Sequence, residues 1–160
     1  MSVRVGMGYD VHPFGSEGPL VLGGVSIDGE GLLGHSDADV VAHAVADALL
    51  GPAGLPDLGA RYPASDEQFR GASSLELLRD VVAAVAAAGW QPVNVDVVIA
   101  AERPVLAPHL DAIVVNLGAA LGDGVHVSVK PKRGEGLGAI GRGEGIAVWA
   151  VALLEQGPVR

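Results

Sequence analysis

Three side chains in the first part of the chain, Asp10, His12 and His43, are of types that could together bind a divalent metal ion. Asp10 and His12 lie two residues apart at the end of an expected strand, where alternate side chains project from the same face. His43 lies in an apolar segment with a helical pattern. Two imidazoles and one carboxylate, with a fourth position open, are typical of catalytic rather than structural zinc. The pattern indicates a zinc enzyme, and its alternative is a set of hydrogen-bonded residues without a metal.

The composition limits the kind of protein and of site. The 160 residues fit one domain, residues 1–160, in which we expect residues 156–160 to fray. A formal net charge of −9 argues against general binding to nucleic acid or anionic membranes, so a phosphate substrate would need local cations. Because the chain has no cysteine, disulfides, thiolate catalysis and sulfur-ligated zinc are excluded. Any metal would be held by nitrogen and oxygen atoms.

The apolar residues point to burial between subunits as well as within one. Trp, Tyr and Phe occur only twice each, so the core must consist of Ala, Val, Leu and Ile. Such small side chains cover long contiguous surfaces, which favours an oligomer. No apolar run is long enough to span a membrane, and the first residues alternate like a strand rather than a signal peptide. We therefore expect a cytoplasmic location.

The elements that must position the candidate ligands are strands and helices in mixed order. The patterns predict strands ending near residue 12 and over 20–27, 93–101 and 125–130, and helices over 38–50, 74–88 and 108–122. Segments 29–34 and 52–63 are expected loops, and segment 146–154 fits both helix and strand.

The predicted helix that carries His43 also carries two carboxylates at a spacing of four residues. Ser36 or Asp37 is its expected N-cap. Asp39 is expected on a solvated face of this helix. Asp47 could lie on the same solvated face or orient His43, because metal-bound histidines usually need such a partner.

Gly136, Gly138 and Gly141 match the G-x-G-x-x-G dinucleotide fingerprint, but their context does not. A hydrophilic segment, 130–135, separates them from the preceding strand, and only 19 residues follow Gly141. A Rossmann unit needs a helix, a further strand and an acidic residue about 20 positions on. We expect a phosphate-binding or interface loop here instead.

Eight ordered motifs extend the metal pattern along the chain from about Val3 to Leu154. They are Asp10-Val11-His12, Leu22-Gly23-Gly24-Val25, His35-Ser36-Asp37, His43, Asp47-Ala48-Leu49-Leu50-Gly51, Asp57-Leu58-Gly59, Asn94-Val95-Asp96 and Gly141-Arg142-Gly143-Glu144-Gly145. With this set the chain resembles the 2-C-methyl-D-erythritol 2,4-cyclodiphosphate synthases, which are zinc enzymes of non-mevalonate isoprenoid biosynthesis.

The resemblance implies an α+β subunit with a four-stranded mixed sheet and helices on one side. Three such subunits would pack their sheets around a threefold axis as a homotrimer, with each active site between neighbours. It also implies that segment 146–154 is a strand, which periodicity alone leaves open.

The implied reaction converts 4-diphosphocytidyl-2-C-methyl-D-erythritol 2-phosphate to the cyclic diphosphate and releases CMP, as a phosphorus–oxygen lyase. The 2-phosphate of the substrate attacks its own β-phosphorus, so no catalytic base is required. Zinc on Asp10, His12 and His43 would take a phosphate oxygen in its open position. A second divalent ion, Mg²⁺ or Mn²⁺, would bridge the α and β phosphates and contact Glu135.

Further site residues follow from the same resemblance. His35 and Arg133 occupy the positions of residues that stabilise the transition state. The segment 101–107 corresponds to the cytosine pocket. The expected substrate-binding residues are Asp10, His12, His35, Ser36, Asp57, Leu58, Gly59, Tyr62, Pro63, Ala64, Ser65, Asp66, Ala101, Glu102, Arg103, Pro104, Val105, Leu106, Ala107, Lys132, Arg133, Gly134, Glu135 and Arg142.

Some positions depart from the family pattern. Arg133 replaces a threonine, and its guanidinium could bind phosphate by charge but cannot replace a hydroxyl. Val105 stands where a lysine is common, and Ala139 where an aromatic side chain often lines a central cavity of the trimer. Arg142 and Glu144 are kept, either as an interface ion pair or as ligand-binding residues.

Two other functions fit parts of the pattern. The same three ligands would suit a zinc phosphohydrolase that uses metal-bound water. A non-catalytic trimer that binds CMP or isoprenoid diphosphates would also account for an apolar, oligomeric chain. The product formed from the expected substrate separates these alternatives.

Overall fold

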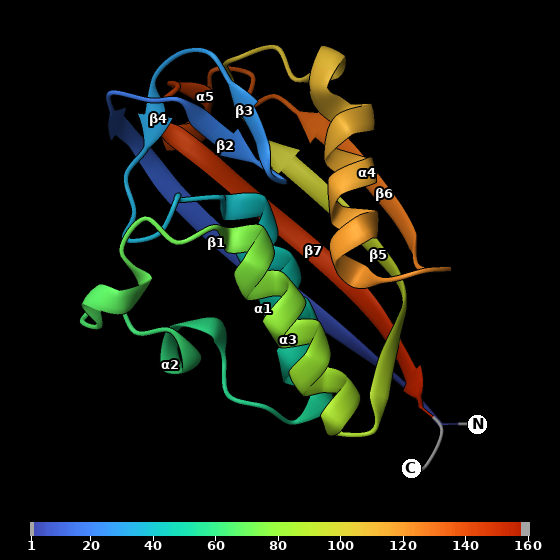
Figure 1. Cartoon of the computed structure of the whole chain (residues 1–160). Coiled ribbons are helices and arrows are strands. Elements are labelled where there is room, and N and C mark those ends of the chain that lie inside the picture. The colour runs from blue at the N-terminus through green and yellow to red at the C-terminus, as the bar shows by residue number, and fades with distance from the viewer. Residues whose placement is uncertain (1, 158–160) are drawn as a thin grey trace.

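In a computed structural model, which describes residues 2–157, the chain folds into a mixed β-sheet with a layer of helices on one face (Figure 1). The sheet has the strand order β4-β1-β7-β5-β6, in which only β5 and β6 are parallel. Its strands are β1 (Val3–Ser16), β4 (Gly31–Leu32), β5 (Trp90–Ala100), β6 (His126–Lys132) and β7 (Gly145–Gln156). The main helices are α1 (Val40–Ala53), α3 (Ser74–Ala87) and α4 (Leu110–Leu121).

Short elements complete the chain. The β2–β3 hairpin stands apart from the main sheet, and the short helices lie in the connections. Their bounds are β2 (Leu20–Leu22), β3 (Val25–Ile27), α2 (Leu58–Arg61), η1 (Glu67–Phe69), η2 (Ala107–His109) and α5 (Gly138–Gly141). Helix α5 contains Gly138 and Gly141 of the G-x-G-x-x-G match and lies in the connection from β6 to β7. This connection lacks the long helix of a Rossmann unit, as the sequence around the glycines predicts. The predicted fraying at residues 158–160 lies outside the described residues, whereas Gln156 still belongs to β7.

The sheet has five strands, so the expectation of four was wrong. The fifth is β4, which lies in a segment expected to be a loop and pairs with the end of β1. Strand β1 continues to Ser16 rather than ending near residue 12, and its last residues give β4 a partner. A strand of two residues has no periodicity for a sequence pattern to detect.

The expected strand over 20–27 is a hairpin. Leu22 pairs with Val25, and the two residues between them, Gly23 and Gly24, have φ angles of 55° and 70°. A two-residue turn with both φ angles positive is the tight turn that suits a β-hairpin, and glycine adopts it without strain.

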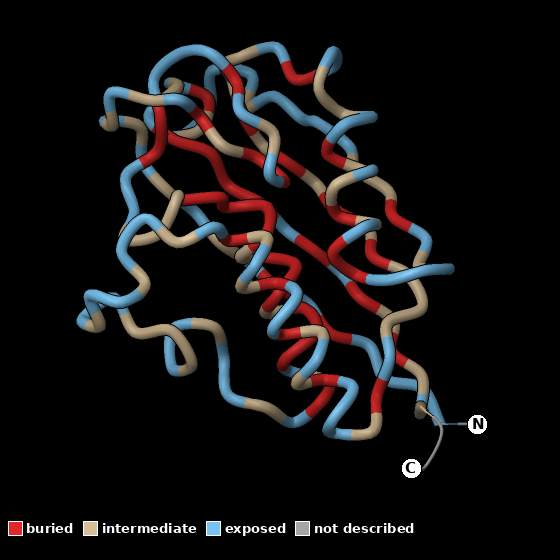
Figure 2. Tube along the Cα trace, viewed as in Figure 1, coloured by how far each residue is buried: buried red, intermediate tan, exposed pale blue. Residues whose placement is uncertain are grey.

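Strand β7 resolves the ambiguous segment 146–154 as a strand at the centre of the sheet. It pairs antiparallel with β1 on one side and β5 on the other. Val148, Ala150 and Ala152 are buried under the helices, whereas Trp149 and Val151 face away from them. The buried positions run between the helices and the sheet (Figure 2). This alternation is that of a strand with its two faces in different surroundings.

Helix α1 packs very closely on β1. A Cβ atom at Gly8 would overlap the carbonyl oxygen of Ala44, and one at Gly6 would overlap that of Ala48. Only glycine permits this approach of helix backbone to strand backbone. The close packing brings the middle of α1, including His43, beside the end of β1 that carries Asp10 and His12.

Asp39 is the N-cap of α1, which corrects two expectations. Neither Ser36 nor Asp37 caps the helix, and Asp39 is not solvated, since its exposed fraction is 0%. Its carboxylate accepts hydrogen bonds from the backbone N–H groups of Val41 and Ala42 and from those of Gly23 and Gly24 in the hairpin. Burial raises the pKa of Asp39, while these donors lower it in part. Asp39 therefore connects the hairpin to α1.

Replacing Asp39 with alanine is expected to lower the free energy of unfolding by about 2–4 kcal/mol. The variant loses a helix cap and leaves further buried N–H groups without acceptors. Urea denaturation at one fixed protein concentration measures the change. Asp28→Ala, at an exposed carboxylate, is the control and should change the value by less than about 0.5 kcal/mol. An equally small change in Asp39→Ala would contradict the assigned role.

The face of the sheet without helices is apolar and exposed. Alternate residues of β1 project from it, together with two residues of β7; they are Val3, Val5, Met7, Tyr9, Val11, Trp149 and Val151. The rings of Tyr9 and Trp149 pack against each other across the two strands at a tilt of 47°, with centroids 5.2 Å apart. Monomeric proteins rarely expose a continuous apolar patch of this kind.

Within residues 2–157 no helix is both long and apolar enough to cross a membrane.

Candidate metal centre

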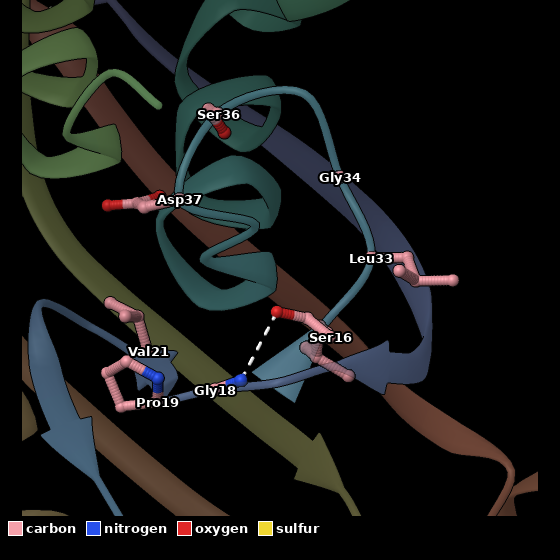
Figure 3. Close-up of a pocket in the computed structure, with 9 residues that line it drawn as sticks. Ser16, Gly18, Pro19, Val21, Leu33, Gly34, Ser36 and Asp37 are labelled. Carbon is pink, nitrogen blue, oxygen red and sulfur yellow. Dashed lines mark hydrogen bonds between the residues drawn. The ribbon is translucent and has the colours of Figure 1, made fainter. Parts of the chain in front are cut away.

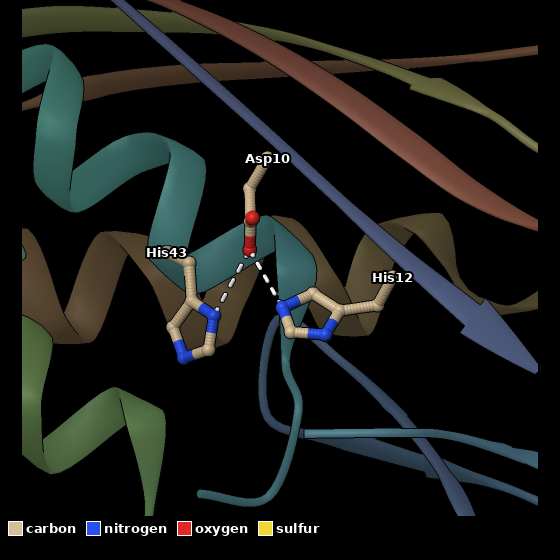
Figure 4. Close-up of side chains that lie close together, drawn as sticks. All are labelled: Asp10, His12 and His43. Carbon is tan, nitrogen blue, oxygen red and sulfur yellow. Dashed lines mark hydrogen bonds and ion pairs between the residues drawn. The ribbon is translucent and has the colours of Figure 1, made fainter. Parts of the chain in front are cut away.

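Asp10 and His12 of β1 and His43 of α1 converge at the junction of the sheet and helix layers (Figure 4). Asp10 Oδ2 lies 3.0 Å from His12 Nε2 and 3.0 Å from His43 Nδ1. One ligand atom from each residue lies within 4.8 Å of the others. The expected trio is thus brought together by strand alternation and by the close packing of α1 on β1.

The second nitrogen of each imidazole has its own partner. His12 Nδ1 lies 2.6 Å from the carbonyl oxygen of Leu33 and therefore donates to it. His43 Nε2 lies 2.8 Å from Ser74 Oγ and 3.2 Å from Ser36 Oγ. Metal-bound histidines typically use their second N–H in this way, which fixes the ring and leaves the other nitrogen free as a ligand. The residues present therefore fit a divalent ion held by two nitrogens and one oxygen.

The electrostatics favour an ionised Asp10. Burial alone would raise the pKa of its carboxyl group, but the hydrogen bonds with His12 and His43 outweigh burial and lower the pKa to about 2. The pKa of His12 is raised, mainly by its hydrogen bond to Asp10. Asp10 is consequently a carboxylate at neutral pH, as a metal ligand must be.

A cavity of about 280 Å³ opens beside the three residues. Other expected substrate contacts line it, namely His35, Ser36, Leu58, Gly59, Tyr62 and Ala64. Asp47, Phe69 and Leu77 line it as well, and of these only Asp47 was considered from the sequence. Phe69 packs edge-on against Tyr62, with ring centroids 5.2 Å apart. Nothing in the local pattern of Phe69 or Leu77 indicated a site.

Asp47 does not hydrogen-bond to His43. Its Oδ1 accepts the backbone N–H of Leu58 at 2.7 Å, and burial raises its pKa. Asp57 caps the adjacent α2 by accepting from Ala60 N at 2.8 Å. Asp47 therefore holds the segment that carries Leu58 and Gly59 against α1, rather than orienting the imidazole.

The remaining residues of the 57–66 segment act locally. Asp66 caps η1 with its side chain, and its carbonyl oxygen lies 2.9 Å from His35 Nε2. His35 therefore donates through Nε2 to that carbonyl. Pro63, Ser65 and Asp66 do not line the cavity.

A second cavity, of about 370 Å³, lies where the parallel strands β5 and β6 end. It shares no lining residue with the first, and its walls are Ala101, Glu102, Pro104, Val105, Leu106, Ala107, Pro131, Lys132 and Arg133. Arg103 turns away to contact Phe14 and Glu30 instead. The expected nucleotide-binding residues are thus grouped, but apart from the metal centre.

Two ion pairs involve charged residues that were expected to contact the substrate, one of them in the wall of the second cavity. Arg133 forms an ion pair with Glu102, which also accepts the backbone N–H of Gly134 at 3.1 Å. Arg142 pairs with Glu144, with 2.6 Å between Nε and Oε1. Glu135 lines neither of these two cavities and has a positive φ of 53°.

A third cavity, of about 400 Å³, was not predicted from the sequence (Figure 3). Residues from two stretches of the chain line it: Ser16, Gly18, Pro19, Val21, Leu32, Leu33, Gly34, Ser36 and Asp37. Ser36 also lines the cavity at the metal centre. The segment 33–37 therefore separates two cavities.

Comparison with known proteins decides the family. A model of the YgbB family matches residues 3–155. The chain belongs to the YgbB family. A relative from Bordetella petrii, named 2-C-methyl-D-erythritol 2,4-cyclodiphosphate synthase, is 55% identical over 155 residues, which are 96% of either chain. One from Thermosynechococcus vestitus with the same name is 50% identical and covers 98% of this chain and 99% of its own.

Solved structures show the same fold in this family. The bifunctional IspDF from Campylobacter jejuni matches with a TM-score of 0.93 and 41% identity over 97% of this chain, which spans 42% of that longer protein. The Plasmodium falciparum IspF, described as a CDP complex, matches with a TM-score of 0.84 and 30% identity over 98% of both chains. The expected resemblance to the cyclodiphosphate synthases is therefore confirmed.

Proposed function

We propose that this member of the YgbB family converts 4-diphosphocytidyl-2-C-methyl-D-erythritol 2-phosphate to 2-C-methyl-D-erythritol 2,4-cyclodiphosphate and CMP, as a phosphorus–oxygen lyase. The observation that carries the proposal is the cluster of Asp10, His12 and His43 in the wall of a cavity, in a chain whose relatives are named as this synthase. We place the reaction in isoprenoid precursor biosynthesis and the enzyme in the cytoplasm.

The site would act chiefly by holding two phosphates of one substrate together. Correct placement of reacting groups can remove about 7–11 kcal/mol from a barrier. Zinc bound by Asp10, His12 and His43 would act as a Lewis acid toward a phosphate oxygen and offset the repulsion between the anions. His35, fixed through Nε2 by the Asp66 carbonyl, presents Nδ1 as the nitrogen that can contact the substrate. The attacking group is a phosphate of the substrate, so no protein base is needed.

We also propose that the enzyme is a homotrimer with shared active sites. The exposed apolar face of β1 and β7 would be buried around the threefold axis. The metal-centre cavity of one subunit would then face the second cavity of its neighbour, which accounts for their separation within one chain. The CDP complex described for the Plasmodium falciparum relative supports a cytidine nucleotide as ligand.

The second cavity would bind the cytidine part of the substrate. Lys132 and Arg133 supply positive charge there, although Glu102 neutralises part of the charge on Arg133. Arg133 would take the place of the usual threonine by charge alone. Glu135 would contact a second ion, Mg²⁺ or Mn²⁺, bound to the substrate phosphates, and Arg142 would contribute a further substrate contact.

Phosphorus NMR of the reaction mixture tests the function. With the proposed substrate, zinc and Mg²⁺, we expect signals of a cyclic diphosphate together with CMP in equal amounts. Linear phosphates in place of the cyclic product would indicate a zinc phosphohydrolase. Tight binding of CMP with no turnover would indicate a non-catalytic binding protein. Either result would overturn the proposed reaction.

A further inference from the structure

Ser74 is a buried polar side chain in contact with a metal ligand. It is the first residue of α3 and has an exposed fraction of 1%. Its hydroxyl oxygen lies 2.8 Å from His43 Nε2 and also contacts the carboxylate of Asp37. The backbone N–H of Ser74 donates to the other oxygen of Asp37 at 3.0 Å. Asp37 thus binds Ser74 through both carboxylate oxygens.

The direction of these hydrogen bonds follows from the groups involved. A carboxylate can only accept, so the single proton of the Ser74 hydroxyl points to Asp37. The lone pairs of Ser74 Oγ are then left for His43, whose Nε2 must carry the hydrogen and donate it. The hydrogen that His43 Nδ1 donates to Asp10 Oδ2 at 3.0 Å is then the one that a metal ion would replace, which leaves the Nδ1 lone pair for the ion while Nε2 keeps its hydrogen.

We propose that Asp37 and Ser74 are positioning residues that hold His43 in the tautomer and ring orientation required for metal binding. The inference rests on the proposed metal centre and extends it by one layer of residues. Outer hydrogen-bond partners of this kind typically change metal affinity by about 10- to 100-fold when they are removed. Asp37 and Ser74 lie on separate elements, so the metal centre depends on the contact between α3 and the segment before α1.

A purely structural role is the alternative. Asp37 could serve only to bind the free N–H groups at the start of α3, since Ser73, the N-cap, makes no side-chain capping bond. In that case loss of Asp37 or Ser74 would lower stability and leave the intrinsic zinc affinity of the folded protein unchanged. Zinc affinity therefore separates the two roles.

The sharpest variant is Asp37→Asn, which keeps the size of the side chain and its acceptor for Ser74 N–H but loses the acceptor that Oδ1 offers to the backbone N–H of Asp39 at 3.1 Å. The new amide can donate to Ser74 Oγ, which frees the hydroxyl proton to point to His43 and favours the wrong tautomer. Ser74→Ala removes the partner of His43 altogether. Ser73→Ala is the matched control, because its hydroxyl makes no capping bond at the same helix end.

Zinc dissociation constants measured by competition with a chelator test the inference, with circular dichroism confirming the folded state. We expect increases of about 10- to 100-fold in Asp37→Asn and Ser74→Ala, and less than about twofold in Ser73→Ala. Visible spectra of the cobalt-substituted proteins should shift in the first two variants only. Wild-type affinity and spectra in both would overturn the positioning role while leaving the metal centre intact. Failure of the wild-type protein to bind zinc would overturn the metal centre itself.

Discussion

Replacing His43 with alanine is expected to abolish zinc binding and to lower turnover by at least about 1,000-fold. The side chain supplies one of three ligand atoms. A metal ion that stabilises developing charge lowers the activation barrier by several kcal/mol, which corresponds to a rate change of about 1,000-fold. His43 lies at the edge of the core, so the subunit should remain folded and assembled. Zinc content, turnover and sedimentation velocity measure the three properties.

His126→Ala is the matched control for this prediction, because His126 is an exposed histidine at the start of β6. It should retain wild-type zinc content and turnover. If His43→Ala kept both as well, the metal-centre assignment would be refuted. If it lost turnover but kept a full complement of zinc, His43 would act on the substrate rather than as a ligand.

Replacing Met7 with glutamate is expected to dissociate the proposed trimer and abolish turnover in the same variant. Met7 is 69% exposed in the single chain and lies in the middle of the apolar face of β1. An unpaired charge buried there would cost about 4 kcal/mol, enough to weaken association by about 1,000-fold. Because the proposed active site uses two subunits, dissociation would separate its halves. Light scattering coupled to gel filtration gives the mass, and CMP release gives the turnover.

Val115→Glu is the matched control, since Val115 is 67% exposed but lies on α4, which covers the opposite face of the sheet. It should leave both mass and turnover unchanged. A Met7→Glu variant that remained a trimer would exclude this face as the interface. An active monomer would instead exclude the shared site while leaving the interface assignment in place.

The metal trio could be predicted from the sequence because local rules position each member. Strand alternation places Asp10 and His12 on one face, and the helical pattern of the apolar segment places His43 in the middle of a helix. Their meeting depends on the packing of α1 on β1 through Gly6 and Gly8, which no local pattern reveals. The ordered motifs supplied that information instead.

Features that depend on distant partners could not be predicted. Asp39 was expected in solvent because its spacing matches a helix surface, yet the hairpin that covers it is formed by residues 20–27. Ser74 was expected only as a helix start, because its contact with His43 spans 31 residues of sequence. Strand β4 exists only because β1 continues past the predicted end. In each case the deciding partner lies elsewhere in the chain.

The close contact between α1 and the glycines of β1 determines which parts of the protein can change without altering the candidate metal centre. The distance from His43 to Asp10 is set by backbone resting on backbone, with no side chain acting as a spacer. We therefore expect that core residues elsewhere can change in volume without altering the separation of the ligands. Because Gly6 and Gly8 have no side chains, they fix the dimensions of the candidate metal centre. Much of the core could change during evolution while these dimensions remain constant.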